Sequence, residues 1–521
     1  MTRRRAIAVL LLLTAAAIAI QGYHPGLEDD AYYLAAIKRD LNPALFPHDA
    51  DFFRLQFQAT IFDKLIAESI RITHLPLSLT ISLWQFVATL ALLAACLAIA
   101  RRCFQTEQAH WAAVLTVAVL LTIPVSGTGI SLTDQYLHPR AIATAAILAA
   151  IVAILDRRRL HAAILLAAAA AMHVIMAAFG IPLCLFLWRN SRGDSHGVPI
   201  TRGFRVMGWR GPRLSGRAKL DSAAATIFAS AALPLPWLFQ PTTEAWRHAA
   251  ATRHFNLLTH WPWYEWLGVI APIFILYYFS RIARRTQATT RAHLSTRLLY
   301  YAIFQLTIAL AIMLPPQLER LRPFEPMRYL HLVYLLMFLI AGGLIGQHVL
   351  GKHVYRWLLL FIPLSAGMFY AQRQLYPSTA HLELPGAKPS NDYLQAFAWI
   401  RQNTPTGALF ALDPYYMQQP GEDFHGFRAL AERSALADMV KDPGMVARVP
   451  TLAERWQQEV SSTKNWQNFH PSDFAKLRTT FGVTWVVLEK RVFAKYDSPT
   501  QSTAAMVCPY ENRTVKVCRV E

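Results

Sequence analysis

Uncharged apolar runs of roughly 20 residues recur through the first 371 positions of the chain, and each run of this length predicts a helix that crosses a membrane. The first run follows a basic N-terminus and has no small-residue cleavage site after it, which favours a retained span over a removed signal peptide. The predicted spans lie at 6–20, 77–100, 111–125, 141–155, 160–188, 223–239, 267–280, 298–314, 330–346 and 357–370.

Basic residues lie in the short connections between these runs, which is the positive-inside pattern of cytoplasmic loops. The run at 160–188 has basic residues on both flanks, so a single crossing would place one flank on the wrong side. A hairpin of two short helices with its tip near His173 resolves this conflict. The chain is then expected to cross the membrane about eleven times, with a cytoplasmic N-terminus and an external C-terminal region.

This topology places four loops on the outer side, at 21–76, 126–140, 241–265 and 315–328. The inner loops are mostly short and basic, except for the Gly-, Ser- and Arg-rich loop at 190–219, which is expected to be flexible and to face lipid. Within the first outer loop, apolar residues recur at helical spacing over 31–41 and over 55–72. Both stretches predict amphipathic helices that lie flat on the membrane surface.

Hydrophobicity falls from Gln372 onward, where Pro, Gly and polar residues mark a domain boundary. The predicted elements after it are helices at 391–402, 428–440, 452–460 and 473–480, strands at 408–412 and 483–488, and a β-hairpin over 506–520. The predicted fold class is therefore mainly α: a polytopic transmembrane helical bundle at 1–371, followed by a small α/β domain at 372–521.

Composition supports a membrane protein, because 54% of the residues are hydrophobic. The formal net charge of +19 would suit nucleic-acid binding, but the basic residues lie beside apolar runs. Topology and attraction to anionic lipids explain that placement, so no nucleic acid is expected. The chain has no Walker, G-x-G-x-x-G, G-x-S-x-G or H-E-x-x-H motif, which argues against ATPases, dinucleotide-binding enzymes, lipase-type hydrolases and zinc proteases.

Five cysteines divide into two groups. Cys96, Cys103 and Cys184 lie in or beside apolar runs, where cysteine behaves as a small hydrophobic residue. Cys508 and Cys518 flank the last predicted hairpin. An external C-terminal region would allow a disulfide between them, and two free thiols are the alternative.

The densest acidic group of the membrane half follows the first span, where Glu28, Asp29 and Asp30 precede Tyr33. Carboxylates at this position suit general base catalysis or the binding of a divalent metal. The alternative is that Asp30 caps the helix that starts at Ala31 and that its two acidic neighbours complement the helix dipole.

Three histidine and carboxylate positions in or near the outer loops are further candidates. Asp134 and His138 lie in the segment DQYLHPR just before a span. Asp134 is a candidate second carboxylate for metal or substrate, and an ordinary polar connection is the alternative. His173, a polar residue among alanines at the predicted hairpin tip, either lines a cavity or makes an interhelical hydrogen bond.

Arg320, Arg322 and Arg328 lie in an outer loop, against the positive-inside trend. Guanidinium groups bind phosphate in a bidentate manner, so these three are candidates for binding a lipid phosphate. Surface ion pairs with Glu319 and Glu325 are the alternative. In the C-terminal region, the Arg residues of the segment FRALAERS are candidates for contacting an acceptor, with a solvated helix face as the alternative.

Taken in order along the chain, these features resemble the GT-C class of glycosyltransferases, which use polyprenyl-phosphate-linked sugars. Two C-terminal segments, NTP at 403–405 and YEN at 510–512, are similar to the tails of bacterial members. The W-W-D-x-G motif of oligosaccharyltransferases is absent. The residues that carry the resemblance are Glu28, Asp29, Asp30, Tyr32, Tyr33, Asp134, Arg328 and Tyr329.

The resemblance implies an inverting glycosyltransferase of the bacterial inner membrane that moves a sugar from a polyprenyl-phosphate-linked donor to an acceptor on the periplasmic side. It implies Asp29 and Asp30 as catalytic residues and Mg or Mn as a candidate cofactor held by Asp30 and Asp134. Its partners are expected to be membrane lipids and the donor, with no stable protein partner. The implied substrate-binding residues are Glu28, Tyr33, Asp134, His138, Arg320, Arg322, Arg328 and Tyr329.

Two other classes of protein fit the same pattern. A transporter or flippase would carry a lipid-linked or small polar substrate across the membrane, and such proteins favour ionisable groups near the middle of their spans. A non-catalytic membrane scaffold would use its outer domain to bind envelope partners.

Overall fold

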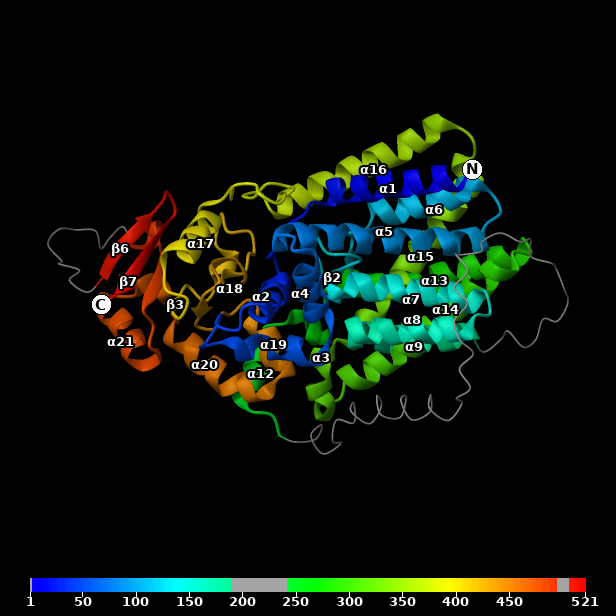
Figure 1. The fold of residues 1–521 in the computed structure, drawn as a ribbon. Coiled ribbons are helices and arrows are strands. Elements are labelled where there is room, and N and C mark those ends of the chain that lie inside the picture. The colour runs from blue at the N-terminus through cyan, green and yellow to red at the C-terminus, as the bar shows by residue number, and fades with distance from the viewer. Residues whose placement is uncertain (1, 189–240, 494–505) are drawn as a thin grey trace, which may run out of the picture.

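The structure is a computed structural model that describes residues 2–188, 241–493 and 506–521. It is mainly helical, with a small β-sheet in the C-terminal region. Apolar helices run side by side in a bundle, and the C-terminal region lies against the end of the bundle that is distant from the N-terminus (Figure 1). The bundle includes α1 (Arg3–Gln21), α5 (Leu77–Cys103), α6 (Glu107–Val119), α7 (Pro139–Leu155), α8 (Arg159–Met172), α9 (Val174–Trp188), α13 (Trp263–Arg285), α14 (Thr289–Met313), α15 (Leu330–Ile345) and α16 (Val354–Leu375).

Six helices within the described ranges are long and apolar enough to cross a membrane, and they are consistent with a membrane protein. They are α1, α5, α13, α14, α16 and the segment Pro326–Leu350, which contains α15. The prediction of about eleven crossings is not confirmed, because α6, α7, α8 and α9 have 13, 17, 14 and 15 residues, fewer than the roughly 20 that a crossing needs. The predicted span at 223–239 and the predicted loop at 190–219 lie outside the described residues.

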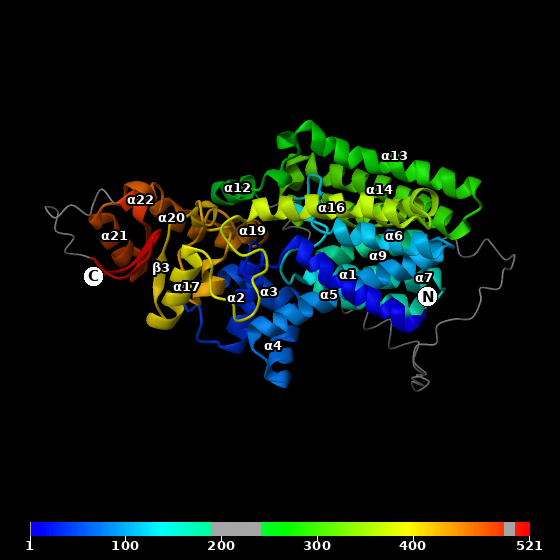
Figure 2. The ribbon, with the colours of Figure 1, turned by 90° about the horizontal axis from the view of Figure 1, so that it is seen from above.

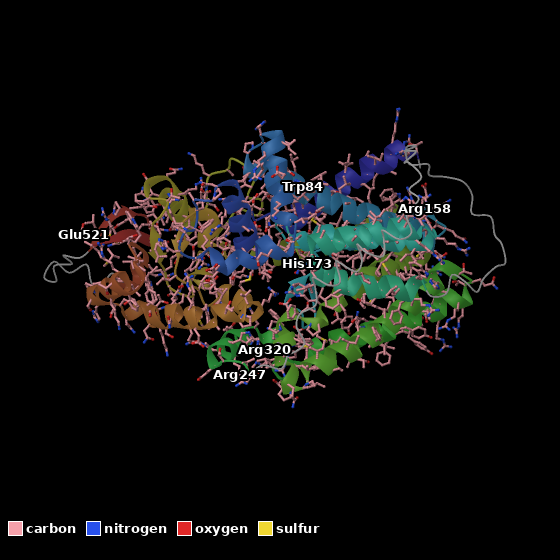
Figure 3. All side chains as sticks on the ribbon, turned by 60° about the horizontal axis from the view of Figure 1, so that its bottom comes forward. Trp84, Arg158, His173, Arg247, Arg320 and Glu521 are labelled. Carbon is pink, nitrogen blue, oxygen red and sulfur yellow. A yellow bond between two sulfur atoms is a disulfide. The ribbon has the colours of Figure 1, made fainter. Side chains whose placement is uncertain are left out.

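α8 and α9 form a hairpin whose tip is the single residue His173, as the basic flanks of this apolar run predict. His173 has an extended backbone, with φ −155° and ψ 98°, which ends α8. α9 packs closely against α7, because a Cβ at Gly180 would lie only 2.7 Å from Cδ1 of Ile147. His173 lies at the end of the bundle that faces the C-terminal region, whereas Arg158 lies at the other end (Figure 3).

Five strands of the C-terminal region form one sheet in the order β4-β3-β5-β7-β6. The first three are parallel, and β6 and β7 add an antiparallel hairpin. The strands are β3 (Leu409–Ala411), β4 (Ser434–Ala435), β5 (Trp485–Glu489), β6 (Met506–Glu511) and β7 (Val515–Val520). The helices of this region are α17 (Asp392–Asn403), α18 (Phe427–Ala431), α19 (Asp442–Arg448), α20 (Ala453–Ser462), α21 (Pro471–Phe481) and α22 (Lys490–Phe493).

The predicted helix at 428–440 is much shorter in the structure. α18 ends at Ala431, and the chain continues into β4, where Ser434 pairs with Leu409 of β3. The apolar residues of this segment therefore pack as part of the sheet and do not form one face of a helix. Strand pairing with a distant segment overrides the local helical pattern here.

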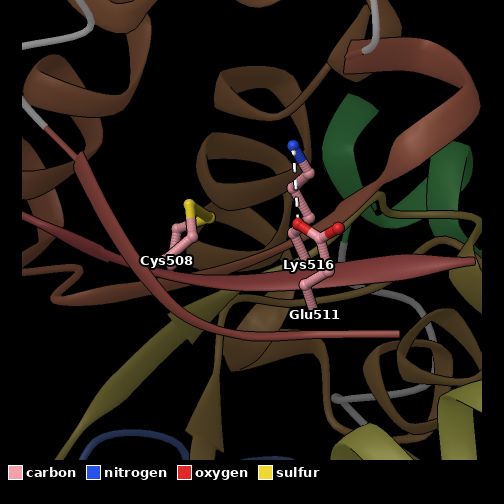
Figure 4. The surroundings of a disulfide bond; sticks show 4 residues. Cys508, Glu511 and Lys516 are labelled. Carbon is pink, nitrogen blue, oxygen red and sulfur yellow. Dashed lines mark ion pairs between the residues drawn. A yellow bond between two sulfur atoms is a disulfide. The ribbon is translucent and has the colours of Figure 1, made fainter. Parts of the chain in front are cut away.

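The last hairpin carries a disulfide between Cys508 in β6 and Cys518 in β7 (Figure 4). An ion pair lies near it, in which Nζ of Lys516 is 3.7 Å from Oε2 of Glu511. The three free cysteines, all buried, are Cys96, Cys103 and Cys184.

The first loop, at 21–76, contributes α2 (Asp30–Leu41), α3 (Arg54–Ala59) and α4 (Phe62–Thr73). Residues Asp30 to Lys38 of α2 are all buried, so the expectation that α2 lies flat on the membrane surface is wrong. α2 packs against both α18 and α4, and an amphipathic pattern does not tell how many partners cover a helix. α4 extends from the side of the molecule (Figure 2), and Ile61 and Ile72 near its two ends are 48% and 77% exposed.

The C-terminal region shares its hydrophobic core with loops of the bundle. One cluster of buried residues combines Phe52 and Phe53 of the first loop, Trp246 of α12 (Glu244–Ala251) and Trp456 of α20. The chain leaves the bundle at the end of α16, close to the boundary predicted at 372. The packing unit at this end of the molecule therefore combines parts of the first and third loops with the described residues of the C-terminal region.

Candidate active site

The acidic residues that follow α1 lie where the bundle, the first loop and the C-terminal region meet. Two β-bridges hold this segment to C-terminal residues, one from Tyr23 to Leu382 and one from Leu27 to His425. The chain then turns at Glu28, whose φ of 53° is a left-handed conformation that is unfavourable for a residue with a side chain. Strain of this kind is concentrated at functional sites in proteins, so the turn is a reason to look closely at its neighbours.

Asp29 and Asp30 have different environments although they are neighbours in sequence. Asp30 is 4% exposed, and its Oδ2 accepts the N–H of Gly26 at 2.6 Å. Burial raises the pKa of Asp30 to about 7, although the Gly26 N–H and then Lys38 act to lower it. Asp29 is the N-cap of α2, but its side chain makes no capping hydrogen bond and is 37% exposed. The carboxylate of Asp29 is thus accessible, whereas that of Asp30 stabilises the backbone turn.

Cations from three parts of the chain surround the carboxylate of Asp29. Nζ of Lys441, which directly precedes α19, lies 3.2 Å from its Oδ1. Burial alone would raise the pKa of Asp29, but Lys441, together with Arg253 and Arg328, holds this pKa well below the usual range. Asp29 is therefore ionised at neutral pH.

Glu325 joins two of the nearby arginines. Its Oε2 lies 2.5 Å from Nη1 of Arg328, and its Oε1 lies 2.9 Å from Nη2 of Arg448. Arg328 belongs to η5 (Pro326–Tyr329), just ahead of α15, and Arg448 ends α19. Both guanidinium groups lie within electrostatic range of Asp29. A late segment of the bundle and the C-terminal region are thus linked by one carboxylate beside the acidic loop.

The second loop, at 126–140, also reaches Asp29. The backbone N–H of Asp29 donates to the hydroxyl of Tyr136 at 3.3 Å. Asp134 forms a buried ion pair in which its Oδ1 lies 2.5 Å from Nη2 of Arg140. Burial raises the pKa of Asp134, Arg140 lowers it, and the charge of Asp29 raises it again. The two carboxylates therefore lie close enough to influence one another.

Three rings pack beside these carboxylates. The ring of His138 lies 4.8 Å from that of Tyr33 and 5.8 Å from that of His173, measured between centroids. His173 thus belongs to the site and does not make the interhelical side-chain hydrogen bond that the sequence left open. Its Nδ1 accepts a backbone N–H of its own helix, that of Met176, at 3.2 Å.

Arg320 and Arg322 serve a different purpose. They lie in η4 (Pro316–Phe324), and their Nη2 atoms donate to the carbonyl oxygens of Pro241 and Pro315 at 2.7 and 3.3 Å. Neither is among the cations that lower the pKa of Asp29. The two arginines are therefore placed to hold loops together.

The remaining acids and aromatics of this loop also have structural partners. Glu319 pairs with Arg247, at 3.1 Å between Oε1 and Nη2, and Arg322 lies within electrostatic range of the same carboxylate. Tyr329 is fully buried, with its ring 6.2 Å from that of Tyr301. Its hydroxyl has no hydrogen-bond partner among the described residues.

The acidic residues do not form a metal site. No group of three or more His, Cys, Asp or Glu side chains within the described ranges is arranged to hold a metal ion. Asp30 and Asp134, the predicted ligands of Mg or Mn, bind the N–H of Gly26 and the guanidinium of Arg140 instead. The positive charge near Asp29 comes from Lys and Arg side chains.

A buried ion-pair network that the sequence did not reveal positions Lys441. Arg428 of α18 contacts Asp49 of the first loop, and its Nη1 lies 2.9 Å from Oδ1 of Asp442, the residue after Lys441. The guanidinium also lies over the ring of Phe52, at 5.3 Å from the centroid. Among 51 Lys and Arg residues, no motif distinguishes Arg428 or Lys441. Arg428 is buried, so the alternative of a solvated helix charge is wrong for this residue.

Comparison with known proteins adds no further constraint. No protein-family model matches the chain, and no curated protein matches it. The function must therefore be argued from the chemistry of the site.

Proposed function

We propose that the chain is a membrane-bound glycosyltransferase of the GT-C type, which transfers a sugar from a polyprenyl-phosphate-linked donor to a hydroxyl group of an acceptor. The observation that carries the proposal is the environment of Asp29. Its accessible carboxylate is kept ionised by Lys441 and Arg328 at the end of an apolar helix bundle. In the proposed transfer from a lipid-linked sugar, the apolar bundle accommodates the lipid, the base takes the proton of the acceptor and the cations stabilise the phosphate.

The proposed reaction uses these groups at one point. Asp29 accepts the proton of the acceptor hydroxyl while the hydroxyl oxygen forms a bond to the anomeric carbon of the sugar. The bond from that carbon to the phosphate oxygen breaks, and its electron pair stays on the phosphate. Lys441 and Arg328 stabilise the negative charge that develops on the leaving phosphate. Attack from the face opposite the phosphate inverts the anomeric centre.

The other candidates take supporting roles in this proposal. Asp30 is the buried partner that fixes the turn before Asp29 through its bond to the Gly26 N–H. Glu28 contacts Lys441 and holds it beside Asp29. Asp134 fixes the guanidinium group of Arg140 near the reaction centre. The nearby aromatic rings complete the site by contacting the sugar.

We assign the site to the periplasmic side of a bacterial inner membrane. The N-terminus and Arg158 lie at the end of the bundle that is distant from the C-terminal region (Figures 1 and 3). Basic residues favour the cytoplasmic side, so the acidic loop and residues 372–521 belong on the opposite side. A transporter would place its ionisable groups near the middle of the spans, whereas Asp29 follows the end of α1.

The test compares Asp29→Asn with Asp30→Asn. The full chain in detergent micelles is given a panel of polyprenyl-phosphate-linked sugars and hydroxyl acceptors, and released polyprenyl phosphate is measured. Loss of the base is expected to lower the rate by about 100-fold or more, while Asp30→Asn keeps measurable transfer. Equal rates for wild type and Asp29→Asn would refute the assignment. Movement of labelled lipid across vesicle membranes without sugar transfer would favour a flippase.

A further inference from the structure

Two helices of the bundle begin close to one another, and each is capped by a histidine, the first of which lies within electrostatic range of Asp29. His138 precedes α7, and its Nδ1 accepts the N–H of Arg140 at 2.9 Å. His173 precedes α9, and its Nδ1 accepts the N–H of Met176 at 3.2 Å. The ring centroids of the two histidines are 5.8 Å apart. The two helices have 17 and 15 residues. The positive ends of their dipoles therefore lie together at the two histidines.

The hydrogen bonds define which ring nitrogen of each histidine is a donor. A ring nitrogen that accepts a backbone N–H carries no proton, so the proton of each neutral ring is on Nε2. Burial, followed by the charge of Arg140, lowers the pKa of both His138 and His173 well below the usual range. Both rings are therefore neutral at physiological pH. Each presents one Nε2–H donor and no negative charge.

Two buried guanidinium groups add further donors around the same place. Arg140 and Arg328 are 2% and 6% exposed, and the charge of each acts on both histidine rings. Asp134 pairs with Nη2 of Arg140, and Glu325 pairs with Nη1 of Arg328. Nε and Nη1 of Arg140 and Nε of Arg328 have no hydrogen-bond partner among the described residues. Buried donors without acceptors are unfavourable, so this cluster favours a ligand that brings several acceptor oxygens.

We propose that the N-termini of α7 and α9 form a phosphate-binding site with His138, His173, Arg140 and Arg328. A phosphate group fits because its oxygens point in several directions and match donors that come from two helix ends and two guanidinium groups. A single carboxylate has only two oxygens and would leave most of these donors unused. Asp29 lies within electrostatic range of His138 and Arg328, which places the base next to the bound phosphate.

This inference deepens the proposed function and rests on it for the source of the phosphate, namely the polyprenyl-phosphate end of the donor. It divides the hydrogen-bond donors of the site into two sets. His138, His173, Arg140 and Arg328 hold the phosphate from the bundle side. Lys441 belongs to the C-terminal side and controls the charge of Asp29.

The test measures binding of two probes, inorganic phosphate and a short-chain polyprenyl phosphate, to the purified full chain. The main variant combines His138→Asn with His173→Asn. Asparagine can still cap a helix by accepting a backbone N–H, but its side chain is too short to replace Nε2. The matched control is His470→Asn, because His470 caps α21 in the C-terminal region in the same way. If the double variant does not fold, the two single variants replace it.

We expect the double variant to bind polyprenyl phosphate at least tenfold more weakly than the wild type, and His470→Asn to bind it unchanged. Tighter binding of polyprenyl phosphate than of inorganic phosphate supports the lipid donor as the source. Equal binding of both probes, weakened in the double variant, supports a phosphate site that takes free phosphate. Unchanged affinity in the double variant, or no preference of the wild type for either probe over chloride, would overturn the site.

Failure of this inference can be told apart from failure of the proposed function. Asp29→Asn is expected to bind polyprenyl phosphate at least as tightly as the wild type, because it removes a negative charge near the phosphate, while it loses sugar transfer. Phosphate binding without transfer from any donor in the panel would refute the transferase and leave the phosphate site intact. Transfer at the wild-type rate by the double variant would refute the phosphate site and leave the transferase intact.

Discussion

Replacing Arg428 with Met is expected to destabilise the contact between the first loop and the C-terminal region by about 3–5 kcal/mol, the usual cost of breaking a buried ion pair. Arg428 contacts Asp49, and its Nη1 and Nη2 lie 2.9 and 3.0 Å from the two carboxylate oxygens of Asp442. The side chains of both acids are 0% exposed. Methionine has a similar length but no charge, so it would leave two carboxylates buried without their counterion.

The loss of stability in Arg428→Met should depend on pH. Burial raises the pKa of Asp442 to about 7, although Arg428 acts to lower it. Removing Arg428 raises that pKa further in the folded protein. An acid whose folded pKa lies above its unfolded pKa loses stability as the pH rises through the folded value. The destabilisation by Arg428→Met is therefore expected to be larger at pH 8 than at pH 5.

The assay is thermal unfolding of the full chain in detergent, followed by tryptophan fluorescence. A change of this size corresponds to a fall in Tm of roughly 10 °C for a region of about 150 residues. The matched control is Arg513→Met, because Arg513 is 90% exposed in its pair with Asp392, and exposed pairs contribute about 0–1 kcal/mol. Equal Tm values for Arg428→Met and the control at pH 8 would refute the reasoning. Because Asp442 follows Lys441, the same variant is also expected to slow sugar transfer.

Three further predictions concern stability. Asp30→Asn should raise the Tm more at pH 9 than at pH 5, because an acid with a folded pKa of about 7 costs on the order of 4 kcal/mol at high pH and only about 1–2 kcal/mol at pH 5; equal effects at both pH values would contradict this. Cys508→Ser combined with Cys518→Ser should lower the free energy of unfolding by about 2–3 kcal/mol, and faster protease cleavage of the last hairpin would show this loss. Gly127→Ala should lower the free energy of unfolding by about 3 kcal/mol, measured as a lower Tm. The reason is that φ of Gly127 is +66° and a Cβ would lie 2.0 Å from the Trp261 ring; an unchanged Tm would show that the turn can move.

The helical bundle and the hairpin tip at His173 could be predicted from the sequence because each depends on local properties. The length of an apolar run and its basic flanks indicate that a buried or lipid-facing helix is present. They do not indicate whether that helix crosses a membrane completely. α7 is largely buried by neighbouring helices and has 17 residues, yet its sequence is as apolar as that of a longer span. This is why the predicted number of crossings is not confirmed.

The contacts that complete the site could not be predicted, because they join positions far apart in the chain. Lys441 reaches Asp29 across 412 positions and Arg428 reaches Asp49 across 379. A charged residue on a helix is most often solvated, and no local pattern marks the exceptions. The buried position of α2 has the same origin, since α18 covers it from the other end of the sequence.

The distinction between Asp29 and Asp30 shows why a correct motif still leaves the chemistry open. Successive residues of an α-helix point about 100° apart, so two adjacent acids at a helix start cannot face the same partners. The left-handed turn at Glu28 sets the direction from which α2 begins. With that direction fixed, Asp30 points back to the N–H of Gly26 and Asp29 points to Lys441. The backbone conformation of one residue therefore decides which acid is accessible as a base and which one supports the turn.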